Sequence, residues 1–234
     1  EGALAFARAV ELADSPVPAT GDLDEFRAIH RHLFQDVYDW AGELRTINMR
    51  KLTPGAELFM PEHLIDRAAS VAGGELRDDR MLRGLDRPKF IERLSYHYDQ
   101  WNHIHPFRDG NGRTQRLFWD RIATDAGWRL DWRTVHGEVN NEACRIASEQ
   151  RDFAPLHQMF DRIATRRGEP GRGDTERVGI RPTVIDPGEA ARLARMDTPL
   201  PPRAVPAPPQ PRHPSAAPET RSATRRTPDP GLGR

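Results

Sequence analysis

Cysteine and long apolar runs are almost absent from this sequence. Of its 234 residues only Cys144 carries a thiol, so the chain can form no intramolecular disulfide and no metal site built from cysteines alone. No stretch approaches the roughly 20 apolar residues that a membrane-spanning helix needs. We therefore expect a cytoplasmic protein without a membrane anchor.

The chain also lacks an excess of either charge, because 35 Lys and Arg residues balance 35 Asp and Glu residues. This balance would not draw the whole chain to nucleic acid or to an anionic membrane. We expect no direct nucleic-acid partner.

Aromatic residues are missing from the last part of the chain, where proline is concentrated. Residues 168–234 contain fourteen of the 21 prolines and no Phe, Trp or Tyr. Such a segment cannot bury enough apolar surface to offset the entropy lost on ordering. We predict one folded domain over residues 1–167, followed by a Pro- and Arg-rich disordered tail or linker over residues 168–234.

Apolar side chains recur at helical spacing in the first 167 residues, which predicts an all-α domain. We expect helices over residues 4–12, 22–42, 61–69, 86–98, 112–125, 134–150 and 152–165. One segment differs, because residues 45–50 and 57–60 have extended character and flank a turn that contains Pro54 and Gly55. This pattern predicts a small β-hairpin over about residues 45–60.

The most informative stretch is residues 105–116, His-Pro-Phe-Arg-Asp-Gly-Asn-Gly-Arg-Thr-Gln-Arg, which lies between two predicted helices. Gly110, Asn111 and Gly112 permit backbone angles that let successive N–H groups converge on an anion. The helix that follows adds the positive end of its dipole, which favours phosphate.

Charged side chains around this turn suit a nucleotide. Arg113 and Arg116 are three residues apart on one helical face, and guanidinium groups recognise phosphate oxygens. Asp109 supplies an oxygen ligand suited to Mg²⁺. His105 has an ordinary pKa close to 7 and can act as a general base toward a hydroxyl. Each residue alone has a plainer interpretation, such as a helix cap or a solvated surface, but their spacing together favours a site. We assign Phe107 to the core.

The assembled string resembles the signature of the Fic family, His-x-Phe-x-(Asp/Glu)-Gly-Asn-Gly-Arg-x-x-Arg, with no departure at any fixed position. Residues 30–45, Lys51, Phe59 and residues 102–105 are also similar to the small bacterial Fic toxins. The resemblance covers about residues 1–165. It implies a Fic-type helical bundle in which the hairpin at about 45–60 is the flap and residues 105–116 are the signature loop.

The resemblance implies a protein adenylyltransferase, which transfers AMP from ATP to a hydroxyl side chain of a target protein and releases pyrophosphate. His105 would deprotonate the hydroxyl, and Asp109 would hold Mg²⁺ between the α- and β-phosphates. Further contacts to the nucleotide would come from the backbone of Gly110, Asn111 and Gly112, the Asn111 side chain, Arg113, Arg116 at the γ-phosphate, and Lys51.

The resemblance also implies partners. The flap would pair its edge with an extended segment of the target, and the ATPase subunits of type II topoisomerases are the first candidates. Many Fic enzymes are inhibited by a helix with the motif (Ser/Thr)-x-x-x-Glu-(Gly/Asn), which neither residues 165–170 nor residues 134–139 match. We therefore expect the inhibitory glutamate on a separate small antitoxin with a Ser-x-x-x-Glu-Gly helix, or on missing N-terminal residues. An effector of this kind would be delivered into another cell.

Three other interpretations are open from the sequence. A Fic-fold enzyme could move another phosphate-containing group or remove AMP, although Gly112 favours AMP transfer. The fold could be a non-catalytic interaction module with the Pro-rich tail as its working part. A metal-dependent hydrolase could use His97, His103, His105 and Asp109, but it would leave the Gly-Asn-Gly turn unexplained.

Overall fold

The computed structural model describes residues 1–51 and 57–168, so the predicted tail from residue 169 onward lies outside the described residues. Within the described ranges the helical prediction is confirmed. The elements in chain order are α1 (Gly2–Asp14), α2 (Leu23–Phe34), η1 (Glu62–Leu64), α3 (Ile65–Asp78), η2 (Arg80–Leu82), α4 (Arg87–Ile104), α5 (Asn111–Asp125), β1 (Trp128–Leu130), η3 (Trp132–Thr134), α6 (Gly137–Gln150), α7 (Ala154–Ile163) and β2 (Ala164–Arg166).

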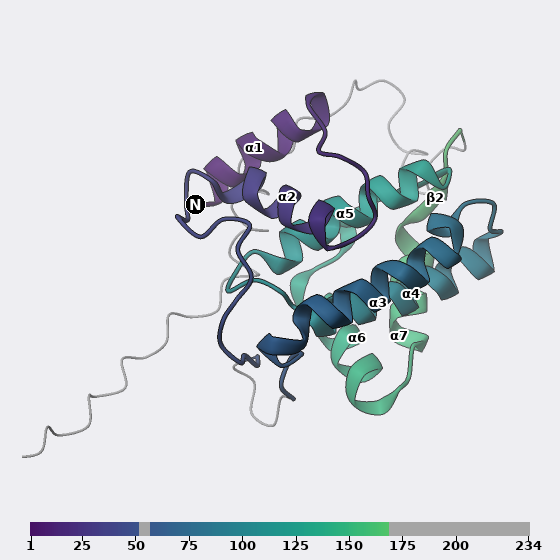
Figure 1. The fold of residues 1–234 in the computed structure, drawn as a ribbon. Helices are drawn as coiled ribbons and strands as arrows, with labels where there is room; N and C mark the ends of the chain where they lie inside the picture. The colour runs from purple at the N-terminus through teal and green to yellow at the C-terminus, as the bar shows by residue number, and fades with distance from the viewer. Residues whose placement is uncertain (52–56, 169–234) are drawn as a thin grey trace, which may run out of the picture. The chain divides into compact units, whose positions relative to one another are not determined.

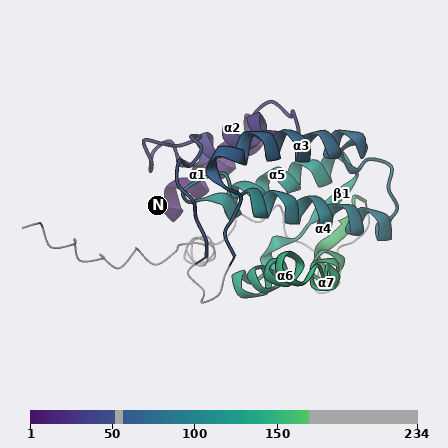
Figure 2. The same ribbon diagram turned by 60° about the horizontal axis from the view of Figure 1, so that its bottom comes forward.

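Helix α4 lies at the centre of the bundle and contacts α3, α5, α6 and α7. Helix α2 packs on α5, and α1 covers α2 on the side away from α6 and α7 (Figure 1). Viewed from another side, α6 and α7 form a pair below α4 (Figure 2). No helix in the described part of the chain is both long enough and apolar enough to cross a membrane.

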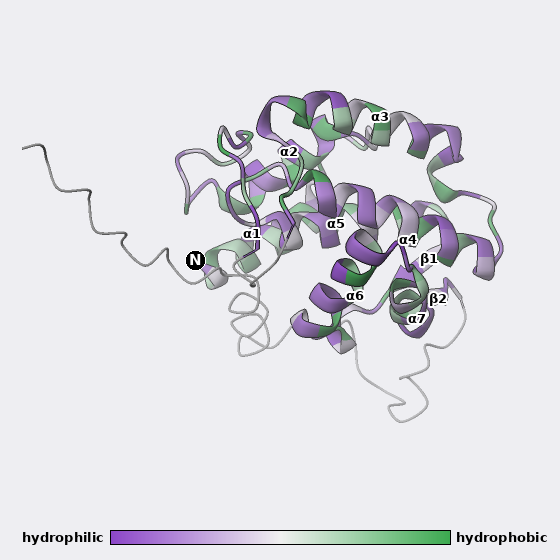
Figure 3. Ribbon diagram, turned by 90° about the horizontal axis from the view of Figure 1, so that it is seen from below, coloured by the Kyte–Doolittle hydropathy of each residue, from purple (hydrophilic) through white to green (hydrophobic). Residues whose placement is uncertain are grey.

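Aromatic side chains form the middle of the core. Phe26 of α2 is fully buried and stacks on Trp101 of α4 with ring centroids 4.8 Å apart. It also stacks on Phe107 and meets Phe118 of α5 edge to face. Hydrophobic and hydrophilic residues alternate along each helix (Figure 3), as expected for helices that bury one face. The core therefore joins α2, α4, α5 and the loop before α5, which is the loop with the signature.

Two helix starts follow from their caps. The Asp22 side chain accepts a hydrogen bond from the Asp24 N–H before α2, and the Asp86 side chain accepts one from the Lys89 N–H before α4. Pro88 sits in the first turn of α4, where its missing N–H costs no helical hydrogen bond.

The end of α2 was predicted wrongly. The helix ends at Phe34 rather than near residue 42, and residues 35–46 return across the bundle. Along this path Gly42 adopts a positive φ of 82°, and the Arg45 N–H donates to the Pro106 carbonyl at 2.9 Å. A continued helix would have carried these residues away from the signature loop.

The end of the last helix also differs from the prediction. Helix α7 stops at Ile163, and residues 164–166 form β2, which pairs antiparallel with β1 in the register Trp128 with Arg166 and Leu130 with Ala164. Trp128, Leu130 and Ala164 are buried, so this small sheet closes one end of the core. Three-residue strands carry too little periodicity to be recognised in the sequence.

The flap is less regular than the predicted hairpin. Its arms are joined by one antiparallel bridge between Arg50 and Leu58 and by a hydrogen bond from the Phe59 N–H to the Met49 carbonyl, and residues 52–56 between them lie outside the described residues. Other flap groups bond elsewhere, since the Met60 N–H donates to the His103 carbonyl of α4 at 2.9 Å. The flap is therefore attached to the end of α4.

We predict that Phe26→Ala lowers the free energy of unfolding by about 3–5 kcal/mol, because it removes a fully buried ring that contacts three others. Chemical denaturation would measure the change. Val10→Ala is the control, because Val10 is 51% exposed and should change stability by no more than about 0.5 kcal/mol. Equal small effects for both variants would contradict this description of the core.

Candidate active site

The signature begins where α4 ends. His105 is the C-cap residue of α4 and adopts a left-handed conformation, with φ 45° and ψ 63°. For a residue other than glycine this conformation costs about 1–2 kcal/mol, so the surrounding contacts must hold it. The His105 N–H donates to the Trp101 carbonyl, and Phe107, two residues on, is fully buried in the core as predicted.

Gly110 provides the turn into α5. Its φ is 77°, and a Cβ atom there would lie 2.4 Å from Cε2 of the buried Phe34. Only glycine fits both the angle and the space. Helix α5 starts at Asn111, so the first-turn N–H groups of Asn111, Gly112 and Arg113 have no intrahelical acceptor. The predicted helix start after the glycine turn is therefore confirmed, and its N–H groups are a candidate phosphate site.

The Asn111 side chain holds the loop, a role that the sequence did not predict. Its Oδ1 accepts from the Phe107 N–H at 2.9 Å, and its Nδ2 donates to the Phe107 carbonyl at 2.8 Å. Asn111 is only 5% exposed. Both polar ends of the amide hold the loop, and Nδ2 carries a second N–H besides the one that bonds to the Phe107 carbonyl.

The buried His30 of α2 holds the middle of the same loop. Its Nδ1 accepts from the Gly42 N–H at 2.9 Å, which leaves Nε2–H to donate to the Asp109 carbonyl at 3.0 Å. The ring stacks on Phe107 with centroids 3.8 Å apart. Burial lowers the pKa of His30 to about 4, so the ring keeps this neutral tautomer.

The Asp109 carboxylate is oriented by two donors. The Tyr38 hydroxyl donates to Oδ2 at 2.9 Å, and the Gly110 N–H donates to Oδ1 at 2.6 Å. Each oxygen keeps a further lone pair. Burial and this hydrogen bond raise the pKa of Tyr38, so the phenol remains a donor. No group of three or more His, Cys, Asp or Glu side chains suited to a metal occurs within residues 1–51 and 57–168. One oriented carboxylate fits Mg²⁺, which takes its other ligands from water and phosphate.

Arg113 is the predicted arginine nearest to Asp109. Its Nη2 donates to Oε1 of Glu1 at 2.7 Å and lies 3.7 Å from Oδ1 of Asp109. The guanidinium carbon is 4.5 Å from the ring centroid of Phe34. The Nε and Nη1 atoms are buried and have no hydrogen-bond partner among the described residues. Two desolvated donors without acceptors favour an anionic ligand.

Arg116 lies in a different environment, so the prediction of one shared anion for both arginines receives no support. Its guanidinium carbon is 5.8 Å from the ring centroid of Trp132 in η3, whereas Arg113 contacts α1 and α2. Next to it on α5, burial raises the pKa of Asp120 to about 7, while the Trp132 hydrogen bond and the positive charge of Arg116 act in the opposite direction.

The imidazole of His105 stacks on Phe59 of the flap with ring centroids 3.7 Å apart and an interplanar angle of 6°. Burial is the main reason that the pKa of His105 falls to about 3, and the positive charge of Lys51 lowers it further. The ring is therefore neutral at pH 7, which is the form that accepts a proton.

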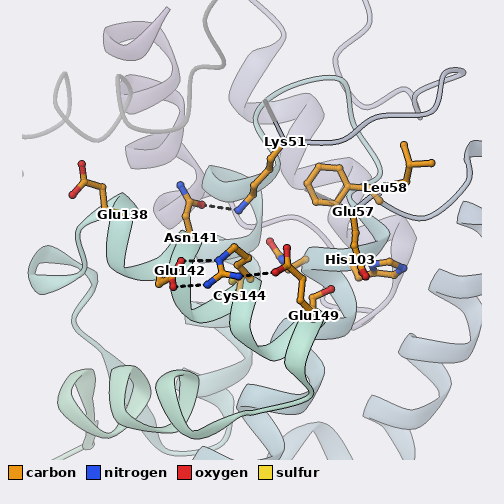
Figure 4. A pocket seen from close by; sticks show the side chains of 13 residues that line it. Lys51, Glu57, Leu58, His103, Glu138, Asn141, Glu142, Cys144 and Glu149 are labelled. Atoms are coloured by element: carbon orange, nitrogen blue, oxygen red, sulfur yellow. Dashed lines mark hydrogen bonds and ion pairs between the residues drawn. The ribbon is translucent and has the colours of Figure 1, made fainter. Parts of the chain in front are cut away.

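A cavity of about 600 Å³ adjoins this end of α4, because Asn102 and His103 line it together with flap residues and α6. Figure 4 shows Lys51 directed to Asn141, with Nζ donating to Oδ1 at 2.9 Å. The cavity wall carries the carboxylates Glu57, Glu138, Glu142 and Glu149. Arg145 neutralises two of them, since it pairs with Glu142 at 2.7 Å and Glu149 at 2.6 Å.

The proposed metal hydrolase site is not assembled. His97 is buried, and its Nε2 lies 2.8 Å from Oδ2 of Asp79, which also pairs with Arg93. This places His97 in an ion-pair cluster between α4 and the end of α3 rather than beside His105 and Asp109.

The predictions from the sequence gave no functional role to three residues that position the site. His30 and Tyr38 lie in the segment 30–45 that carried the resemblance, and Phe59 lies on the predicted flap. The unusual density of His, Tyr and Trp in residues 30–40 was the available signal. The contact of Tyr38 with Asp109 depends on the return of the chain after α2, which the sequence prediction placed incorrectly.

Comparison with known proteins identifies relatives of this chain. The model of the Fic/DOC family matches residues 20–123. The chain is 34% identical over 152 residues to the "Probable protein adenylyltransferase Fic" of Escherichia coli (strain K12), covering 65% of this chain and 74% of that protein. It is 38% identical over 183 residues to the protein adenylyltransferase VbhT of Bartonella schoenbuchensis, covering 76% of this chain but 37% of VbhT.

A solved structure of a bacterial effector is also similar to this chain. The BepC protein of Bartonella tribocorum, a VirB-translocated effector crystallised with AMPPNP, superposes with a TM-score of 0.64 and 26% identity. The match covers 70% of this chain and 83% of that chain.

We predict that the His105 imidazole in the free protein stays neutral from pH 8 down to about pH 5, because burial and Lys51 lower its pKa to about 3. Histidine-selective NMR titration would follow the ring carbon shifts. Lys51→Met removes a positive neighbour and should raise the titration point. A wild-type midpoint near 6.5 that is insensitive to this substitution would contradict the assignment.

Proposed function

This chain belongs to the Fic/DOC family, and from that premise we propose that it is a protein adenylyltransferase, which transfers AMP from ATP to a hydroxyl side chain of a target protein. The observation that supports this proposal most is that a candidate base and a candidate phosphate site lie at the two ends of the short loop between α4 and α5. A neutral His105 precedes, by a few residues, the start of α5 and the two Arg113 donors that have no partner within residues 1–51 and 57–168.

The reaction follows from these groups. The target hydroxyl gives its proton to the His105 ring as its oxygen forms a bond to the α-phosphorus of ATP. The bond from that phosphorus to the oxygen bridging to the β-phosphate breaks, and pyrophosphate leaves with its electron pair. The N–H groups of Asn111, Gly112 and Arg113 and the Arg113 guanidinium stabilise the charge on the phosphates. We assign Arg116, about one turn further along α5 than Arg113, to the γ-phosphate.

Asp109 is the residue that would hold Mg²⁺. Tyr38 and the Gly110 N–H fix its carboxylate next to the start of α5, where the phosphates bind. Bound there, the ion would neutralise phosphate charge.

We place the adenine base in the cavity between the flap and α6. Its carboxylates disfavour the phosphates but accept hydrogen bonds from an exocyclic amine, and its volume of about 600 Å³ suits a neutral heterocycle. Lys51 lines this cavity and lies close enough to His105 to affect its pKa, so it would contact the nucleotide between the base and the phosphates.

The target would bind along the flap. Ile47 and Leu58 are each 58% exposed on the two arms, which is unusual for large apolar residues and suits contact with an extended segment. The ATPase subunits of type II topoisomerases are the first targets to test. Action in the cytoplasm of the producing cell and delivery into another cell both remain consistent with this site.

A contact within this chain shows that a carboxylate can bond to one of the two signature arginines. The Glu1 carboxylate bonds to Arg113, so a guanidinium near the start of α5 accepts a carboxylate. We propose that the glutamate of a Ser-x-x-x-Glu-Gly helix pairs with Arg116 and blocks the γ-phosphate position.

We predict that label from α-labelled ATP appears on protein and that label from γ-labelled ATP does not. We also predict that His105→Ala lowers the rate of AMP transfer by about 10²–10⁴-fold while ATP still binds, because the general base is removed. His63→Ala is the control, because the side chain of that histidine is 68% exposed on η1, outside the signature loop. Labelled protein bands identified by mass spectrometry would give the result. Transfer of the γ-label, or full activity of His105→Ala, would contradict the proposal.

We predict that a small partner with the Ser-x-x-x-Glu-Gly motif inhibits AMP transfer by the purified chain, and that replacing its glutamate with glycine restores the activity. Inhibition should weaken as ATP is raised, because carboxylate and phosphate compete for one guanidinium. The measurement is the transfer rate against partner and ATP concentrations. Inhibition that does not depend on the glutamate would rule out this mode of control.

A further inference from the structure

Arg45 is a buried arginine at the base of the flap, with only 2% of its surface exposed. Its four side-chain hydrogen bonds all go to backbone carbonyl oxygens. Nε donates to His105 at 2.8 Å and Nη1 to Ile47 at 2.7 Å, while Nη2 donates to Met60 and, at 3.3 Å, to Ile104. A single guanidinium thus joins both arms of the flap to the last residues of α4.

The location suits a cation. The last carbonyls of a helix lack intrahelical partners and carry the negative end of the dipole. His105 is also the residue held in the left-handed conformation, and the neighbouring Pro106 carbonyl accepts the Arg45 N–H at 2.9 Å. Arg45 therefore contacts the backbone at His105 with its side chain and the next residue with its own backbone.

These contacts affect the distance between the His105 ring and a target bound along the flap. The His105 ring stacks on Phe59, one residue before Met60, so the ring and the second flap arm share a support. We propose that Arg45 is a positioning residue, which holds the His105 base at a fixed place relative to the flap and thereby to the hydroxyl of a flap-bound target. This inference rests on the proposed function, in which the flap binds the target.

A lysine at position 45 would keep the charge but cannot reach four carbonyls in a planar arrangement. We expect Arg45→Lys at saturating ATP to transfer AMP about 100-fold more slowly than wild type, since displacement of a reacting group by about 1 Å costs that much. The NMR resonances of the His105 ring should shift, because the stacking on Phe59 changes.

Arg87 at the other end of α4 provides a matched control. It too bonds to the carbonyls of a helix end, with Nη1 2.8 Å from the Ala164 oxygen and Nη2 on the Asp161 oxygen, far from the signature loop. Arg87→Lys should lower thermal stability without changing the His105 resonances or the ratio of transfer to ATP binding.

The experiment compares AMP transfer and ATP binding by wild type, Arg45→Lys and Arg87→Lys at a temperature where circular dichroism shows all three folded. If Arg45→Lys does not fold, Arg45→Gln replaces it. Slow transfer at saturating ATP in the position-45 variant alone supports the inference. Wild-type transfer by that variant, or equal loss in both variants, overturns it. If the wild type transfers no AMP, the proposed function fails, and the His105 resonances then decide whether Arg45 positions this ring.

Discussion

The hydrogen bond from the buried His30 ring to the Asp109 carbonyl fixes the loop between α4 and α5, on which the rest of the site depends. Because Nδ1 of His30 accepts a hydrogen bond from the Gly42 N–H, the proton of the neutral ring is on Nε2. Burial keeps the ring uncharged. Because Gly110 can then turn with a positive φ against Phe34, α5 begins with its free N–H groups next to the Asp109 carboxylate. The anion site is thus a product of backbone geometry that side chains from α2 hold in place.

The first residue of this loop, His105, is held by the charged guanidinium of Arg45 rather than by a neutral ring. Arg45 bonds to carbonyls at the end of α4 and in both flap arms, and His105 lies between these contacts. Charge-assisted hydrogen bonds contribute about 1.5–3 kcal/mol each, enough to offset the strain of a left-handed His105. Together the two buried anchors place the neutral His105 ring a few residues from the start of α5, where we propose that the phosphates bind.

The sequence predicted the local features of this site and missed the long-range ones. Residues 105–116 indicated the glycine turn and the helix start because each depends on residue type and spacing within a few residues. The end of α2 at Phe34 and the pairing of β1 with β2 depend on contacts between distant segments, which periodicity does not encode. The bonds of the Asn111 side chain to Phe107 were also not predicted, since a side chain beside a nest can turn toward the loop backbone or toward the ligand. The different surroundings of Arg113 and Arg116 likewise come from α1, α2 and η3 rather than from their spacing on α5.

The central claim is that the α-phosphate of ATP binds between His105 and the start of α5. A crystal structure of the chain with Mg²⁺ and a non-hydrolysable ATP analogue tests this directly. The account predicts phosphate oxygens on the N–H groups of Asn111 and Gly112 and on Nε or Nη1 of Arg113, with the α-phosphorus as the phosphorus nearest to the His105 ring. A nucleotide bound away from α5, or one whose γ-phosphorus is nearest to His105, would contradict it.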